Sequence, residues 1–182
     1  LSLAAATGVI GGTPITAGTA LTALRDPADL VTPLLANGDA ITIDGIKRGG
    51  RDVPSASFTV GTTGTTVGDL LAWLDEAIGI ETSAGVAGSP GVAVTADGRL
   101  EISGNAGTEN ALTIDLGTLT SSGATTVPFA FDQAQAANGE STHTSFVVYD
   151  SIGTPVSVDL TMVMEDRTTG GSTWRFYATS EE

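Results

Sequence analysis

The chain has 182 residues, which is long enough for one large or two small domains with a hydrophobic core. Gly, Ala, Thr and Ser are abundant and aromatic residues make up only 5%, a composition that favours short strands and turns over long helices. Acidic residues outnumber basic ones by 21 to 7, and we expect the resulting net charge of -14 to repel nucleic acids and anionic membranes. The lack of cysteine excludes disulfides, thiolate metal sites and a thiol nucleophile.

Residues 1–38 are predicted to be loop-like, because Gly, Thr and Pro are frequent and the apolar runs are short. No apolar run reaches 18 residues, and the opening "LSLAAATGVIGG" has no basic region, so neither a membrane span nor a cleaved secretion signal is expected. The chain begins without Met and stops at "FYATSEE". We therefore expect an excised piece of a longer protein.

Residues 39–116 predict a β-β-α-β-β-β unit. The segments "DAITIDGIKRGG" and "SASFTV" have the alternation of half-buried strands. Beyond the helix, "GVAVTADGRLEIS" is typical of two strands joined by a turn at Asp97-Gly98, and "NALTIDL" predicts a further strand. Residues 118–140 are again expected to be rich in loops.

One α-helix is predicted within "TTVGDLLAWLDEAIGI". Its apolar residues recur with helical spacing and form one stripe: Val67, Leu70, Leu71, Leu74 and Ile78. Thr66 is placed to cap the start of the helix, with Asp69 three residues later, as in a weak capping box. Gly79 can end the helix in the left-handed region. We expect the stripe to pack on the surrounding strands.

The segment "TSFVVYDSIGTPVSVDLTMVM", residues 144–164, predicts a β-hairpin, and "STWRFYAT" predicts a last strand. If apolar residues face each other, Val148 lies opposite Val156 and Phe146 lies opposite Val158. Ser151, Ile152 and Gly153 then form the loop, with Gly153 at positive φ. The second strand places its apolar side chains on one face, which we expect to be the core side: Val156, Val158, Leu160, Met162 and Met164.

The residues with catalytic potential are few and scattered. His143 is the one histidine of the sequence and is predicted to be an ordinary surface or edge residue. Ser89 in "AGSPG" lacks the first Gly of a nucleophile elbow, and the following Pro removes an oxyanion-hole donor. "GTTGTT" lacks the Lys of a phosphate-binding loop, and Asp97 and Asp115 are too isolated to bind calcium. We therefore expect no catalytic site, metal or cofactor.

Two further features have open interpretations. Lys47, Arg48 and Arg51 hold three of the seven positive charges and form either a docking patch for an acidic surface, such as a neighbouring copy, or a solvated β-turn. Trp73 and Trp174 raise the possibility of carbohydrate binding, but Trp73 adjoins the apolar stripe and is predicted to pack on it.

The hairpin resembles a segment of bacterial flagellar hook proteins, in which a strand ending in V-Y-D-S-x-G precedes an alternating strand and a Trp-containing one. The matching residues are Val148, Tyr149, Asp150, Ser151 and Gly153, whereas Thr154 replaces the Asn that often follows the Gly. The preceding "VPFAFDQAQAANGEST" also resembles the approach to this motif. The resemblance implies a mainly β fold, with a β-sandwich or barrel-like hook domain made of residues 1–38 and 117–182. Residues 39–116 would then be an inserted small α+β unit.

The inserted unit itself resembles the β-α-β insert of flagellins and hook-family proteins, through "ITIDGI", the helix and "GRLEISGN". Leu74-Asp75 replaces the Ile-Asn pair that is usual in the flagellin helix, which argues against flagellin itself.

Both resemblances imply a structural subunit of the extracellular flagellar hook, a flexible tube that transmits torque from rod to filament. Its partners would be further copies, joined through terminal helices outside this piece, and other axial proteins of the flagellum. Because those helices are missing and the charge is -14, we expect this piece to be monomeric in dilute solution. A rod protein of the same axial family and an extracellular β-rich adhesin remain the alternatives.

Overall fold

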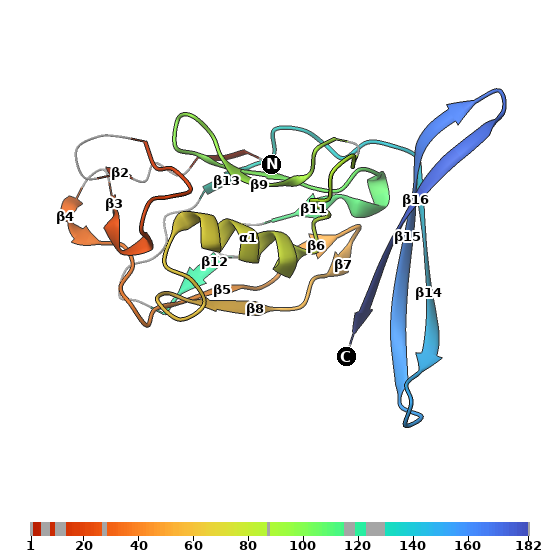
Figure 1. Ribbon diagram of the computed structural model, residues 1–182, viewed down its shortest axis with the longest axis horizontal. Helices are drawn as coiled ribbons and strands as arrows, with labels where there is room; N and C mark the ends of the chain where they lie inside the picture. The colour runs from red at the N-terminus through yellow and green to blue at the C-terminus, as the bar shows by residue number, and fades with distance from the viewer. Residues whose placement is uncertain are drawn as a thin grey trace.

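A computed structural model describes residues 2–4, 8–9, 14–26, 29–86, 88–114, 119–122 and 130–181. These residues form one α-helix, two short 3-10 helices and five small antiparallel sheets, none of which closes into a barrel within the described ranges. The predicted mainly β class is therefore confirmed. Four of the sheets surround the helix in what we call the body, and the fifth, the long sheet, lies beside the body (Figure 1).

The sheets of the body consist of short strands. The largest has the order β13 (Ala130–Asp132), β1 (Ser2–Ala4), β10 (Leu100–Ser103) and β9 (Gly91–Val94). The other three are β12 (Leu119–Ser121), β5 (Ala40–Ile43) and β8 (Ala56–Thr59); β11 (Leu112–Thr113), β6 (Lys47–Arg48) and β7 (Arg51–Asp52); and β2 (Gly8–Val9), β3 (Leu24–Asp26) and β4 (Asp29–Pro33). The 3-10 helices are η1 (Leu21–Ala23) and η2 (Thr108–Asn110).

The helix α1 (Val67–Ile78) begins and ends where its sequence predicts. The Thr66 hydroxyl accepts a hydrogen bond from the Asp69 N–H (3.2 Å), and the Asp69 carboxylate accepts one from the Thr66 N–H (2.9 Å). This reciprocal capping box pairs two N–H groups that the first turn leaves without partners. At the other end, Gly79 has a φ of 73° and closes the helix in the left-handed region.

The hydrophobic core lies under the predicted stripe of α1. All five stripe residues are buried, and Leu74 and Ile78 are each only 1% exposed. The core partners come mainly from the strands around the helix and include Ile41, Ile43, Phe58 and Ile102. Trp73 packs edge-on against Phe58 at a ring-centroid distance of 5.6 Å, so its predicted packing role is confirmed.

The same core extends beyond the predicted boundary at residue 39. Ile15, Leu21 and Leu35 belong to the cluster that contains the helix stripe. In addition, β1 and β13 join β9 and β10 in one sheet, although residues 1–38 and 118–140 were expected to be mostly loop. The packing therefore shows no break at residue 39, and the division into a hook-type domain and an insert stays a prediction.

The long sheet consists of β14 (Ser141–Tyr149), β15 (Pro155–Thr168) and β16 (Gly171–Glu181). Val148 pairs with Val156 and Phe146 pairs with Val158, so the predicted register is confirmed. Gly153 has a φ of 86°, as the loop prediction required. The β15–β16 pairing is continuous except for a register shift between Met164 and Asp166.

The prediction of which face of β15 meets the core is wrong. The two buried side chains of this strand are Thr161 and Val163, which lie on the opposite face from Leu160 and Met162. Thr161 accepts a hydrogen bond from Arg51 in the body, and Val163 lies against Gly107. Alternation identifies the residues that share a face, but it does not say which face meets the body when polar contacts hold that interface.

Candidate functional site

The predicted basic patch lies where the body meets the long sheet. Arg48 points to the C-terminal end of α1, where its Nη1 donates to the carbonyl oxygen of Gly79 (3.1 Å) and lies 3.4 Å from that of Ile78. Its Nη2 donates to Oγ1 of Thr179 in β16 (3.3 Å). A cation is favourable there because the last carbonyls of a helix carry partial negative charge. Arg48 thus joins the helix to the long sheet.

Burial is the main reason why the pKa of Arg48 lies below its ordinary value, and the charge of Arg51 lowers it further. The nearby Asp159 carboxylate acts in the opposite direction. Because the ordinary pKa of an arginine side chain lies far above neutrality, Arg48 remains a cation at neutral pH. The site therefore keeps two positive charges close together.

Arg51 makes a second connection to the long sheet. Its Nη2 donates to the carbonyl oxygen of Glu109 (3.1 Å) and to Oγ1 of Thr161 in β15 (3.3 Å). Its Nη1 lies 3.5 Å from the Glu109 carboxylate. Close approach of the backbone requires Gly49, since a Cβ there would lie 2.0 Å from the Glu109 carbonyl oxygen. The hairpin of β6 and β7 is therefore shaped to reach η2 and β15.

Lys47 differs from both arginines. Its side chain is 49% exposed and forms an ion pair with Asp52 across the hairpin (3.2 Å). Exposed pairs of this kind contribute little to stability. The three predicted residues are thus neighbours, but the two arginines engage groups of their own chain. A contact between subunits through Lys47, Arg48 and Arg51 stays a prediction.

His143 and Asp159 lie on the body-facing side of the long sheet. The His143 Nε2 is 3.2 Å from an Asp159 carboxylate oxygen, and His143 lies on the edge strand β14, where an ordinary edge residue was predicted.

Within the described ranges, no three His, Cys, Asp or Glu side chains come together as metal ligands. No helix in that part of the chain is long and apolar enough to cross a membrane.

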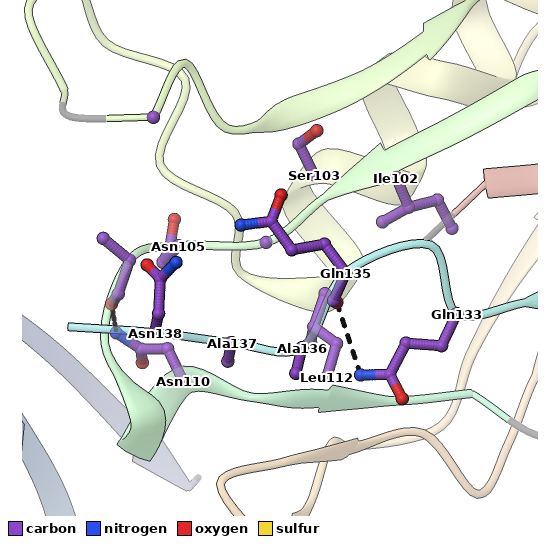
Figure 2. A pocket seen from close by; sticks show the side chains of 13 residues that line it. Ile102, Ser103, Asn105, Asn110, Leu112, Gln133, Gln135, Ala136, Ala137 and Asn138 are labelled. Atoms are coloured by element: carbon purple, nitrogen blue, oxygen red, sulfur yellow. Dashed lines mark hydrogen bonds between the residues drawn. The ribbon is translucent and has the colours of Figure 1, made fainter.

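A cavity of about 260 Å³ lies elsewhere in the body, between the loop after β10 and the segment 133–138 (Figure 2). Its polar walls are mainly side-chain amides: Asn105, Asn110, Gln133, Gln135 and Asn138. Asn105 accepts from the Glu81 N–H (2.9 Å) and donates to the Gly79 carbonyl (3.0 Å). No ionisable side chain is among the described lining residues. These walls can form hydrogen bonds, but they supply no acid or base.

Sequence reasoning did not single out these amides. Asn110 is 2% exposed, and its Nδ2 donates to the Ala106 carbonyl (2.8 Å), whereas its buried Oδ1 has no hydrogen-bond partner among the described residues. The signal in the sequence is the Gly- and Asn-rich run "SGNAGTEN", which is typical of a structured turn.

The V-Y-D-S-x-G motif, residues 148–153, spans the end of β14 and the loop before β15. One Asp150 carboxylate oxygen accepts hydrogen bonds from the Ile152 N–H (2.9 Å) and the Thr154 N–H (2.8 Å). The backbone N–H of Thr154 is the largest cause of a lowered pKa of Asp150. Gly153 supplies the positive φ, and its N–H donates to the Asp150 carbonyl (3.1 Å). Asp150 and Gly153 therefore define the shape of the turn.

The comparison with protein families agrees with this motif. The family model for the flagellar basal body protein FlaE D2 domain matches residues 118–182, about a third of the chain. No curated protein and no solved structure matches the chain. The resemblance of residues 39–116 to a flagellin-type insert therefore stays a prediction. The match includes the whole long sheet, so residues 118–182 are similar to the D2 domain of the flagellar basal body protein FlaE.

Proposed function

We propose that this chain is part of a structural subunit of the bacterial flagellar hook, which polymerises into the flexible tube that transmits torque from rod to filament. The observation that carries the proposal is the D2 family match, which covers the V-Y-D-S-x-G turn and all three strands of the long sheet. We expect a mechanical role without catalysis. The site of action is the extracellular part of the flagellum, and the partners are further copies and other axial proteins, with no nucleic acid or membrane.

The geometry of the long sheet suits a load-bearing domain. Three strands are paired along most of their length, and Arg48 and Arg51 connect the sheet to the helix and to η2. A force applied to the sheet is therefore passed to the core through several parallel hydrogen bonds. A rod protein of the same axial family is the second candidate, because the family match is to a flagellar basal body protein.

An in-frame deletion of the codons for residues 119–181 in the parent gene tests the proposal. We expect basal bodies with no hooks or with misshapen hooks in electron micrographs, and cells that do not spread in soft agar. A plasmid copy of the intact gene should restore both. Normal hooks and normal spreading in the deletion strain would contradict the proposal.

An adhesin is the third candidate and makes a different prediction. If the loops of the chain bind glycans, the purified chain should bind on a glycan array, and the deletion strain should lose attachment but keep its hooks. We expect no binding above that of an unrelated acidic protein.

A further inference from the structure

The chain contains two Asn-Gly sequences, Asn37-Gly38 and Asn138-Gly139. An asparagine in such a sequence is chemically labile, because the glycine has no side chain to shield its backbone nitrogen from the neighbouring side-chain amide. Asparagine is one of the residues that heat degrades in proteins. Both asparagines are exposed, but the structure places the two glycine nitrogens in different surroundings.

The backbone nitrogen of Gly38 is held by a hydrogen bond. Its N–H donates to the Val60 carbonyl oxygen (2.9 Å). The Asn37 side chain also lies close to Gly61, where an added Cβ would be 2.9 Å from the Asn37 Oδ1. This hydrogen bond must break before the nitrogen can react, and one neutral hydrogen bond corresponds to a factor of about five in an equilibrium.

The backbone nitrogen of Gly139 is not held in this way. Its N–H has no hydrogen-bond partner among the described residues, and the same is true of the Asn138 side chain. Asn138 ends the segment 133–138, which forms one wall of the amide-lined cavity and contains neither helix nor strand (Figure 2). The two groups that would react are therefore both free to approach each other.

We propose that Asn138 is a site of spontaneous deamidation that gives isoaspartate and aspartate. The Gly139 nitrogen attacks Cγ of Asn138, a C–N bond forms, the Cγ–Nδ2 bond breaks, and ammonia leaves with the proton that the nitrogen loses. A water molecule then opens the resulting five-membered succinimide ring at one of its two carbonyl groups. Opening at the backbone carbonyl gives isoaspartate, in which the main chain runs through the former side chain, and opening at the other gives aspartate.

The reaction would alter the junction between the body and the long sheet. The Asn138 carbonyl accepts from the Gly107 N–H (2.8 Å), and the Gly139 carbonyl accepts from the Thr108 N–H (3.2 Å). Space is limited there, since a Cβ added to Gly107 would lie 2.9 Å from the Cβ of Ser141 at the start of β14. Isoaspartate adds a methylene to the main chain and a further negative charge. The modification should therefore loosen the attachment of β14 to η2.

Peptide mapping by mass spectrometry, after incubation of the purified 182-residue chain at mildly alkaline pH, tests the inference. We expect the conversion of amide to acid at Asn138 to be faster than at Asn37 by about fivefold or more. A protein-isoaspartate methyltransferase should label the peptide that contains Asn138. In urea the two sites should react at rates within about twofold of each other, because the fold no longer distinguishes them.

Asn138→Gln is the matched variant. It keeps an amide on an exposed side chain, but the longer side chain would have to close a six-membered ring, so we expect labelling at this position to be lost while Asn37 is unchanged. Circular dichroism shows whether the variant folds. A reaction at Asn37 that is as fast as at Asn138 in the folded chain would overturn the inference. An unmodified Asn138 in the folded chain, when both sites have reacted in urea, would also overturn it.

Hydrogen exchange in β14 tests the consequence for the junction. Exchange should be faster in the incubated chain than in the fresh chain. Asn138→Asp adds the charge without the extra methylene and should exchange like the fresh chain. Equal exchange in the fresh and the incubated chain would contradict the loosening of the junction. The inference goes beyond the proposed function and does not rest on it, because it uses only the chemistry and surroundings of the two Asn-Gly sequences.

Discussion

Gly153 is the residue on which the geometry of the β14–β15 turn depends. A Cβ added at this position would meet no atom within 4 Å, so a larger side chain is opposed only by the φ of 86°. Gly153→Val should therefore destabilise the chain by roughly 1–3 kcal/mol, the usual cost of holding a β-branched residue in the left-handed region. Chemical denaturation measures this difference.

Gly170, in the loop between β15 and β16, is the matched control. It is exposed and does not have a positive φ, and the nearest atom to an added Cβ is 3.8 Å away. Gly170→Val should change the free energy of unfolding by less than about 0.5 kcal/mol. Equal losses for the two variants would show that φ is not the cause.

Asp150 makes the stability of the same turn depend on pH. Its folded pKa is lowered, chiefly by the Thr154 N–H, below the unfolded value of about 3.9. The carboxylate therefore stabilises the fold at pH values above about 4, and this contribution is lost as the pH falls through the folded pKa. The stability difference between the wild type and Asp150→Asn should shrink between about pH 6 and pH 2. A difference that is constant across this range would contradict the assignment.

At the scale of elements, substitution of Leu74 tests how much the packing of α1 contributes to the stability of the body. It is 1% exposed and lies in the core cluster, so Leu74→Ala should cost about 2–5 kcal/mol. Glu76→Ala is the control on the exposed side of the same helix and should change stability by less than about 0.5 kcal/mol. A loss below that level for Leu74→Ala would mean that the helix is peripheral to the fold.

The elements that the sequence predicts well are those controlled by local rules. The stripe, Thr66 and Gly79 define α1 within one chain segment, and the pairing of Val148 with Val156 follows from apolar alternation and a short loop. The pairing of β1 with β13 and β10 joins segments that are distant in sequence, and no local pattern in three-residue strands indicates it. The same limit explains the error over the face of β15, which depends on partners outside the hairpin.

At the scale of the whole molecule, substitution of Arg48 tests how much the junction between the body and the long sheet contributes to stability. Its hydrogen bonds reach the last turn of α1 and Thr179, and Arg48→Met removes them while it keeps the apolar stem. Because hydrogen bonds to charged groups contribute about 1.5–3 kcal/mol, we expect a loss of roughly 1–3 kcal/mol. Hydrogen exchange in β16 should become faster.

Lys47→Met is the matched control, since Lys47 precedes Arg48 but is half exposed and pairs only with Asp52 among the described residues. It should change stability by less than about 0.5 kcal/mol and leave the exchange of β16 unaltered. Similar effects of both variants would argue against a specific role of Arg48.

The basic run, residues 47–51, was visible in the sequence, but its partners were not predictable. The groups that Arg48 contacts at the end of α1 and in β16 are 30 or more residues away along the chain.

The account as a whole depends on the place of this chain in the flagellum, which immunogold electron microscopy measures directly. Antibodies raised against the 182-residue chain should decorate the curved hook of isolated hook–basal bodies along its whole length, because every subunit would present its copy of the long sheet. The same hook–basal bodies treated with pre-immune serum serve as the control and should remain unlabelled. Gold confined to the rod would favour the rod protein, and gold on the cell surface with bare hooks would contradict the account.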